Sequence, residues 1–160
     1  MLVAARAELL DAQEKYGEAI DEYKKALASG ANDLSDAVTN NLAVLISLYR
    51  PEEVETAIKL MTELIGVRGP APVFLDTRAV AYVVGSRAEL AVQDLELAIA
   101  QQRKPLYVFH LAWAYELVPE KRPLSGKALD EAKQLGMSSE LLHPLELKKF
   151  GNRYGLRSSR

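Results

Sequence analysis

Apolar residues recur along this chain at intervals of three and four residues, the period of one face of an α-helix. One such stripe, in residues 17–28, consists of Ala19, Ile20, Tyr23, Ala26 and Leu27. Charged residues cover the opposite side of the same segment, as expected for a helix with one buried face. No segment shows the sustained two-residue alternation that is typical of strands. The pattern therefore predicts an all-α chain.

Breaks in the pattern divide the chain into nine expected helices. Proline stands at several of these breaks, where it fits the first turn of a helix because its missing N–H is not needed there. Glycine follows the expected end of other helices, as at Gly136. The predicted helices are 2–14, 17–28, 34–49, 51–65, 72–84, 87–102, 105–118, 124–135 and 139–150.

The helices carry a repeated mark, a small residue followed by a large apolar one. On the first helix of each pair the small residues recur at spacings of 36, 36 and 33, and they are Ala7, Ala43, Ala79 and Ala112. On the second helix the spacings are 38, 34 and 34, and the residues are Ala19, Ala57, Ala91 and Ser125. An ordinary helical bundle would not explain why alternate helices carry the same marks at a near-constant period. The spacing therefore indicates four helix–turn–helix repeats.

These residues resemble the tetratricopeptide repeat (TPR) family in its divergent, bacterial-type form, whose unit has 34 residues. The resemblance covers about residues 1–136. It is clearest in Gly17-Glu18-Ala19-Ile20 with Tyr23, and in Leu111-Ala112 with Tyr115. Arg6 and Arg78 depart from the family pattern because they stand where it has leucine. We expect Arg78 to pack its aliphatic stem and to extend its charged head to solvent or to an acid.

The resemblance implies a right-handed α-solenoid of helix–turn–helix repeats with a C-terminal capping helix. We expect one domain over residues 1–150, with units at about 1–32, 33–69, 70–104 and 105–137 and the cap at 138–150. The cap would cover the fourth pair with Leu141, Leu142, Leu145 and Phe150, leaving Glu146, Lys148 and Lys149 outward. Residues 151–160 are predicted to form a basic, flexible tail.

Composition adds few constraints on function. The net charge is -2 and the chain has no cysteine, so there is no global charge that favours nucleic acid and no thiolate chemistry. No segment has the length and hydropathy to span a bilayer, and the N-terminus lacks the pattern of a signal peptide. We therefore expect a cytoplasmic protein without membrane contact, and the chain as given can be a fragment of a longer one.

Candidate chemistry is sparse. His110 and His143 are far apart in sequence, and only Glu140 and Glu146 lie within a helical turn of His143. We interpret His110 as part of a helix–helix contact or groove wall, not as a general base. The chain has neither a phosphate-binding glycine loop nor a nucleophile motif. We therefore expect no enzyme activity, no cofactor and no metal.

The TPR resemblance implies a concave groove, lined by the first helix of each pair, that binds a peptide or helix of a partner protein. The predicted groove residues are Asn40, Val44, Asp76, Val80, Val83, Phe109, Trp113 and Glu116. Asp76 and Glu116 would favour a basic ligand, and Phe109 and Trp113 would anchor an apolar side chain. The alternative for these two aromatic residues is a structural position under the capping helix.

Two further hypotheses concern partners. The first helix begins without a capping residue, so an alternative function is a structural or oligomerisation segment of a larger multi-repeat protein, with self-association through this open end. The basic end of the chain, with Phe150 and Tyr154 among its charges, resembles a nucleic-acid contact in composition. We favour a solubilising tail, and another protein or peptide, of unknown identity, as the partner.

Overall fold

The structure is a computed structural model that describes residues 2–29 and 35–156, and the described part is helical and contains no strand. The expected boundary between the first two units, at 32/33, lies outside the described residues, as do residues 157–160 of the predicted tail. The α-helices are α1 (Leu2–Ala12), α2 (Tyr16–Ala28), α3 (Ser35–Tyr49), α4 (Val54–Arg68), α5 (Pro72–Val84), α6 (Ala88–Gln101), α7 (Pro105–Leu117), α8 (Ser125–Gln134) and α9 (Pro144–Tyr154).

The helices follow the predicted segments closely, with short 3₁₀ turns at three of the predicted starts. These turns are η2 (Pro51–Glu53), η3 (Arg122–Leu124) and η4 (Ser139–Leu141). Gly136, which follows α8, has a φ of 92°, a left-handed conformation that glycine adopts without a steric penalty. The all-α prediction is confirmed for the described residues.

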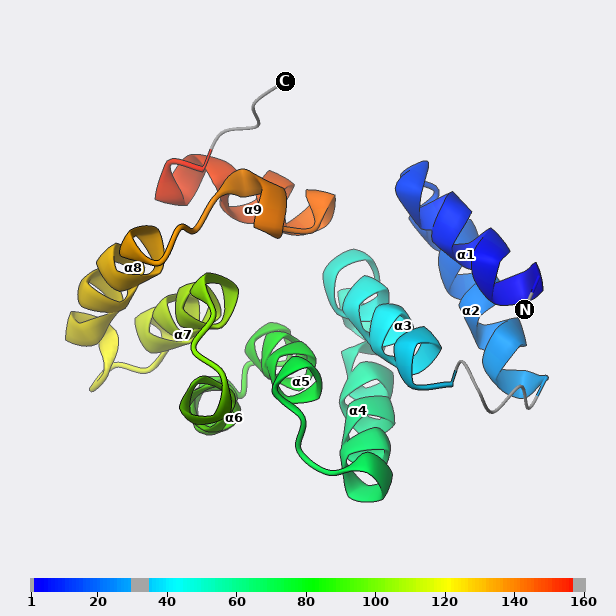
Figure 1. Cartoon of the computed structure of the whole chain (residues 1–160), viewed down its shortest axis with the longest axis horizontal. Coiled ribbons are helices and arrows are strands. Elements are labelled where there is room, and N and C mark those ends of the chain that lie inside the picture. Colours follow the sequence, from blue (N-terminus) through cyan, green and yellow to red (C-terminus); the bar gives the residue numbers. More distant parts are fainter. Residues whose placement is uncertain (1, 30–34, 157–160) are drawn as a thin grey trace.

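From α1 to α8 each helix packs mainly on its neighbours along the chain, and these eight helices form four antiparallel pairs. The pairs are arranged in an arc, with α1, α3, α5 and α7 on its inner side and α2, α4, α6 and α8 on its outer side (Figure 1). The inner helices also contact one another, as α3 does α5 and α5 does α7. We call the surface formed by the four inner helices the concave face. α9 lies across the open side of the arc (Figure 1).

The small residues of the repeat lie where two helices meet. Ala7, Ala43, Ala79 and Ala112 are all buried, and so are their counterparts on the second helices, Ala19, Ala57, Ala91 and Ser125. The buried side chains form two clusters, one over the first two pairs and one over the last two. Tyr82 and Val84 pack against both clusters, so the core is continuous along the arc.

Arg78 is held by an acid inside the third pair. Its Nε and Nη2 atoms lie 2.8 Å from the two carboxylate oxygens of Asp94 on α6, a bidentate geometry. The side chains are only 16% and 10% exposed, and the hydrogen bonds to Asp94 raise the pKa of Arg78 further. The expectation that the head of Arg78 reaches an acid is confirmed. This ion pair joins α5 to α6 inside the third pair.

We predict that Asp94→Asn lowers the free energy of unfolding by about 3 kcal/mol, because it leaves the largely buried Arg78 side chain without its counter-ion. The double substitution Arg78→Leu with Asp94→Leu is expected to recover most of that loss, since an apolar pair can replace a buried ion pair at little cost. Urea denaturation of the three proteins measures this. A double variant as unstable as Asp94→Asn would contradict the prediction.

Candidate functional site

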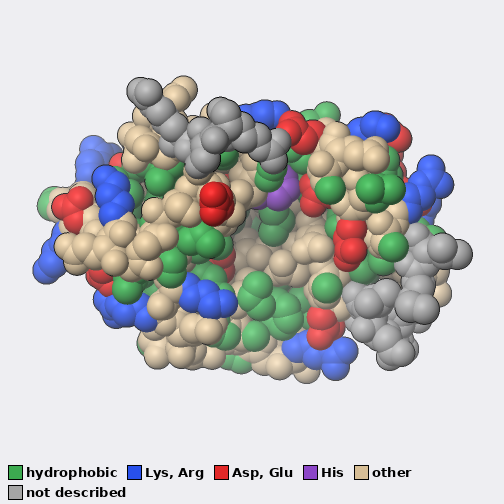
Figure 2. All heavy atoms as spheres, turned by 45° about the horizontal axis from the view of Figure 1, so that its top comes forward, with side chains coloured by type: hydrophobic (Ala, Val, Ile, Leu, Met, Phe, Trp, Pro, Cys, Tyr) green, Lys and Arg blue, Asp and Glu red, His purple; other side chains and the backbone are tan. Residues whose placement is uncertain are grey.

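The concave face is the candidate site, because the predicted groove residues lie on its helices. The structure leaves three of them partly exposed, namely Asn40, Val44 and Glu116. The other five, Asp76, Val80, Val83, Phe109 and Trp113, are buried. In the described arrangement these five therefore offer no open surface to a partner. Figure 2 shows a hollow near the middle of this side of the molecule, with hydrophobic and acidic side chains around it.

Phe109 and Trp113 on α7 are covered by α9. The Trp113 and Phe150 rings lie 4.3 Å apart between centroids, and Phe109 meets Tyr154 edge-on at 5.2 Å. Phe109 is 0% exposed and Trp113 is 5% exposed. We call Phe109, Trp113, Phe150 and Tyr154 the aromatic cluster. Of the two interpretations of the α7 aromatics, the structure therefore shows the one in which the capping helix covers them.

The capping helix starts and ends later than predicted and presents different residues to the repeats. The expected flexible tail from residue 151 is wrong for 151–154, which belong to α9. Glu146 was expected to point outward and is 5% exposed, whereas Leu141 was expected to be covered and is 44% exposed. The reason is the start of the helix: its N-cap is His143, so the buried stripe is displaced from the one predicted for a start at 139.

Gly151 allows the chain to turn back at the end of α9. A Cβ atom added there would lie 2.7 Å from the backbone oxygen of Leu156, which is too close for any larger residue without a backbone shift. The chain turns through Gly155, whose φ is 69°, and Leu156 is buried. The two residues after α9, Gly155 and Leu156, thus fold back against the end of α9.

The middle of α9 is fixed to α5 and α7 by three buried ionisable residues, Asp76, His110 and Glu146, which we call the buried triad. His110 Nδ1 lies 2.7 Å from Asp76 Oδ1, and His110 Nε2 lies 3.0 Å from Glu146 Oε1. The second contact has the distance of an ion pair, but its alignment falls short of a hydrogen bond. Each side chain is 10% exposed or less. An imidazole with a carboxylate at each nitrogen is protonated on both.

Electrostatics agree with this protonation state. Burial disfavours the charged imidazolium, but the two carboxylates outweigh it and raise the pKa of His110 to about 10. Burial likewise opposes ionisation of Glu146, yet His110 and the backbone N–H of His143 hold the pKa of Glu146 below its ordinary value. The triad thus carries one positive and two negative charges at neutral pH. His110 is part of a helix–helix contact, as the sequence indicated.

Glu146 has a second role at the start of α9. Its Oε2 atom accepts a hydrogen bond of 2.9 Å from the backbone N–H of His143, and the side chain of His143 accepts one from the amide of Leu145. This reciprocal arrangement is a capping box. One carboxylate therefore both starts α9 and binds it to α7, which couples folding of the helix to its docking.

The N-terminal end of α9 reaches the first repeat. His143 Nε2 lies 3.1 Å from Asp11 Oδ1, and Lys148 Nζ lies 2.9 Å from Glu14 Oε2. The ring of His143 also packs against Tyr16, which is buried at the start of α2. α9 therefore bridges the two ends of the arc, from the first pair to the fourth.

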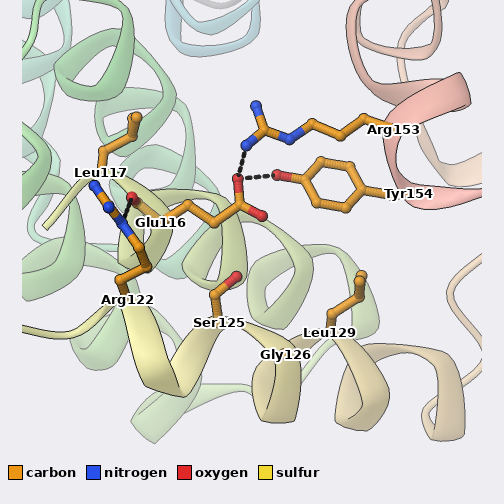
Figure 3. Close-up of a pocket in the computed structure, with 8 residues that line it drawn as sticks. All are labelled: Glu116, Leu117, Arg122, Ser125, Gly126, Leu129, Arg153 and Tyr154. Atoms are coloured by element: carbon orange, nitrogen blue, oxygen red, sulfur yellow. Dashed lines mark hydrogen bonds and ion pairs between the residues drawn. The ribbon is translucent and has the colours of Figure 1, made fainter. Parts of the chain in front are cut away.

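The C-terminal end of α9 closes a pocket against the fourth pair (Figure 3). The pocket has a volume of about 720 Å³ and is lined by Glu116, Leu117, Arg122, Ser125, Gly126, Leu129, Arg153 and Tyr154. Glu116 accepts a hydrogen bond of 2.9 Å from the Tyr154 hydroxyl and pairs with Arg153 at 2.5 Å. Burial and the bond to Glu116 raise the pKa of Tyr154. Ser125 has no histidine beside it in this pocket, so we assign it no nucleophilic role.

Two of the three basic residues of α9 face acids of the same chain, and the third, Lys149, lies over the Trp113 ring. Lys148 is paired with Glu14 and Arg153 with Glu116, so these two charges are already engaged. Glu146, which the sequence placed near His143 as a candidate ligand, is turned to His110 instead of a metal site. Among the described residues no group of three potential metal ligands is close enough to hold an ion.

Comparison with protein-family models, with curated proteins and with solved structures finds no match for this chain. In the described part of the chain, no helix is long and apolar enough to cross a membrane.

Sequence reasoning missed most of the residues that α9 contributes. Phe150 was expected to be covered, but Glu146 and Tyr154 were not, and Asp11 and Glu14 were not connected with the cap. A signal was available in residues 105–117, which are apolar nearly all round; Tyr107 to Ala114 are all buried. A helix of that kind is covered on more than one side. The apolar pattern of α7 therefore indicates that a further element of the chain packs on it, besides α6 and α8.

We predict that stability falls as the pH rises from neutrality towards 10. The raised pKa of His110 means that the folded chain retains a proton that the unfolded chain releases near pH 6.5, so its contribution is complete below that pH and lost towards pH 10. His110→Gln should show a smaller fall. Urea denaturation between pH 6 and 9 measures the slope.

The second histidine supplies the matched control for this experiment. His143→Asn keeps a residue that caps helices and leaves the buried triad intact, so its pH slope should equal that of the parent chain. His110→Gln should also lower the free energy of unfolding at pH 7 by about 3 kcal/mol, because two buried carboxylates lose their counter-ion. Equal pH slopes for all three proteins would refute the assignment of a protonated His110.

Proposed function

We propose that this chain is a protein–protein interaction module, a right-handed α-solenoid of TPR-like repeats whose concave face binds a helix or peptide of a partner protein. The observation that carries the proposal is that an amphipathic helix, α9, already lies on this face. It is held by an acid, two aromatic residues and two basic residues that contact α7 and the turn after α1. A surface with these contacts is suited to helix-in-groove recognition.

The charges of the concave face indicate what kind of helix fits it. Asp11, Glu14 and Glu116 lie around α9 and pair with basic groups of α9 or with its N-cap histidine. The interior offers the imidazolium of His110 and the rings of Phe109 and Trp113. The face therefore favours a helix with a carboxylate and aromatic residues on its buried side and basic residues at its edges.

The burial of five predicted groove residues changes how the proposal is tested. Asp76→Lys or Trp113→Ala would disturb the core, so lost binding would not distinguish a contact from a folding defect. Val44 is partly exposed on α3 and belongs to the stripe assigned to the concave face. Leu97 is 45% exposed on α6, one of the outer helices of the arc, and is the matched control.

We predict that Val44→Glu weakens partner binding at least about tenfold, a loss of about 1.4 kcal/mol, because it adds a charge to the binding surface. Leu97→Glu should leave the affinity within about twofold. A partner identified by affinity capture and mass spectrometry is titrated against both variants by calorimetry. If Leu97→Glu weakens binding and Val44→Glu does not, the partner binds the outer side and the proposal fails.

A further inference from the structure

α9 occupies the concave face as a ligand would. Three sets of contacts hold it, at its start, middle and end: the His143 contact with Asp11 and the Lys148 ion pair with Glu14, the contact between Glu146 and His110, and the aromatic cluster with Glu116. It is joined to α8 only through the segment 135–143, which contains the one-turn η4. The helix has 11 residues, and isolated helices of this length are marginal in water. Its helical form therefore depends on the surface beneath it.

The fit between α9 and this surface is incomplete. Two buried polar atoms in the described part of the chain, Tyr16 Oη and Asn40 Oδ1, lack a hydrogen-bond partner, and His110 Nε2 contacts Glu146 at 3.0 Å without hydrogen-bond alignment. Tyr16 packs on the N-cap of α9, Asn40 is on α3, which contacts α9, and His110 faces Glu146. Unsatisfied buried polar atoms weaken the arrangement that buries them. A helix that bonded these atoms would bind the face more tightly than α9 does.

We propose that α9 is a replaceable internal ligand, and that the partner is a helix carrying the same pattern: a carboxylate followed four and eight residues later by two aromatic residues. In α9 these positions are Glu146, Phe150 and Tyr154, all buried on one side of the helix. The inference rests on the proposed function, since it names the partner class and the regulation of the same face.

Each part of the pattern has a counterpart on the concave face. The carboxylate meets His110, whose other nitrogen is bound by Asp76, so a neutral residue there would leave the imidazolium with one counter-ion. The aromatic residues meet Phe109 and Trp113. Basic residues two and seven positions after the carboxylate, as Lys148 and Arg153 are, meet Glu14 and Glu116. The pattern thus combines charge and shape and is specific to this face.

Competition decides when a partner binds. α9 is attached to the surface by a short connection, so its effective concentration there is on the order of a millimolar. A partner helix competes with that concentration, and binding is weak while α9 is docked. Anything that loosens α9 raises the affinity for a partner without any new contact. The chain therefore holds its own site closed.

The experiment uses the full chain and a fluorescent synthetic peptide with the sequence of residues 138–156 as the probe. Fluorescence anisotropy measures its affinity for the parent chain, for Phe150→Ala and for Asn152→Ala. Phe150→Ala removes a ring of the aromatic cluster and frees the face, so it should bind the peptide at least about tenfold more tightly than the parent chain does. Asn152 is exposed on α9, and its variant should bind like the parent chain.

Changes in the peptide test the pattern. Against the Phe150→Ala chain, peptides carrying Glu146→Gln or Phe150→Ala should bind at least about tenfold more weakly than the original peptide. A peptide carrying Asn152→Ala should bind equally well. If the original peptide does not bind the Phe150→Ala chain up to about 1 mM, or if all four peptides bind alike, the inference is overturned.

Hydrogen exchange of the parent chain tests the inference without any substitution, so a folding defect in a variant cannot affect the result. If α9 is replaceable, the amides of residues 147–154 should exchange faster than those of α7, because α9 opens without unfolding the repeats. Equal, global protection of α7 and α9 would contradict this. The inference and the proposed function can fail independently. A partner whose binding depends on Val44 but whose helix lacks the pattern would refute only the inference and would agree with the proposed function.

Discussion

The ion pairs of His110 with Asp76 and Glu146 constrain the rest of the structure. Taking three ionised groups out of water is costly, and the cost is recovered only when opposite charges meet in close geometry. None of the three residues can stay buried and charged without the others. Because they come from α5, α7 and α9, their pairing fixes the third repeat, the fourth repeat and the cap relative to one another.

This constraint explains why the cap lies on the concave face and not only on the end of the stack. A cap needs nothing more than apolar side chains to cover the last repeat. α9 instead carries its buried carboxylate to His110 and extends its N-terminal end to α1, where His143 and Lys148 meet acids. These two contacts with acids are partly exposed and contribute little to stability, but they set the direction in which α9 lies. The buried triad supplies the strong contact, and the contacts of His143 and Lys148 orient the helix.

The sequence predicted the local and periodic features well and the contacts across the arc poorly. Helix positions follow from apolar spacing and from prolines and glycines, all of which lie within the segment concerned. The small residues of the repeat are buried as expected, because their role depends only on the neighbouring helix. Glu146 and His110 are different: they are 36 positions apart, and nothing near either residue shows that they meet. A carboxylate just before a pair of lysines, as Glu146 is before Lys148 and Lys149, is typical of a solvated helix face, which is why its burial was not predicted.

The same reasoning links stability with recognition. Five of the eight residues that the sequence assigned to a binding groove are buried, and two of these, Phe109 and Trp113, are covered by α9. If α9 left, the concave face would expose Phe109, Trp113 and His110. Their rings and the His110 nitrogen that faces Glu146 would then be available to another helix. A buried position in this chain is therefore not evidence against a role in binding. A structural role and a binding role differ in whether the covering element can leave while the repeats stay folded. The four pairs share a continuous core, and this core can keep the repeats folded without α9.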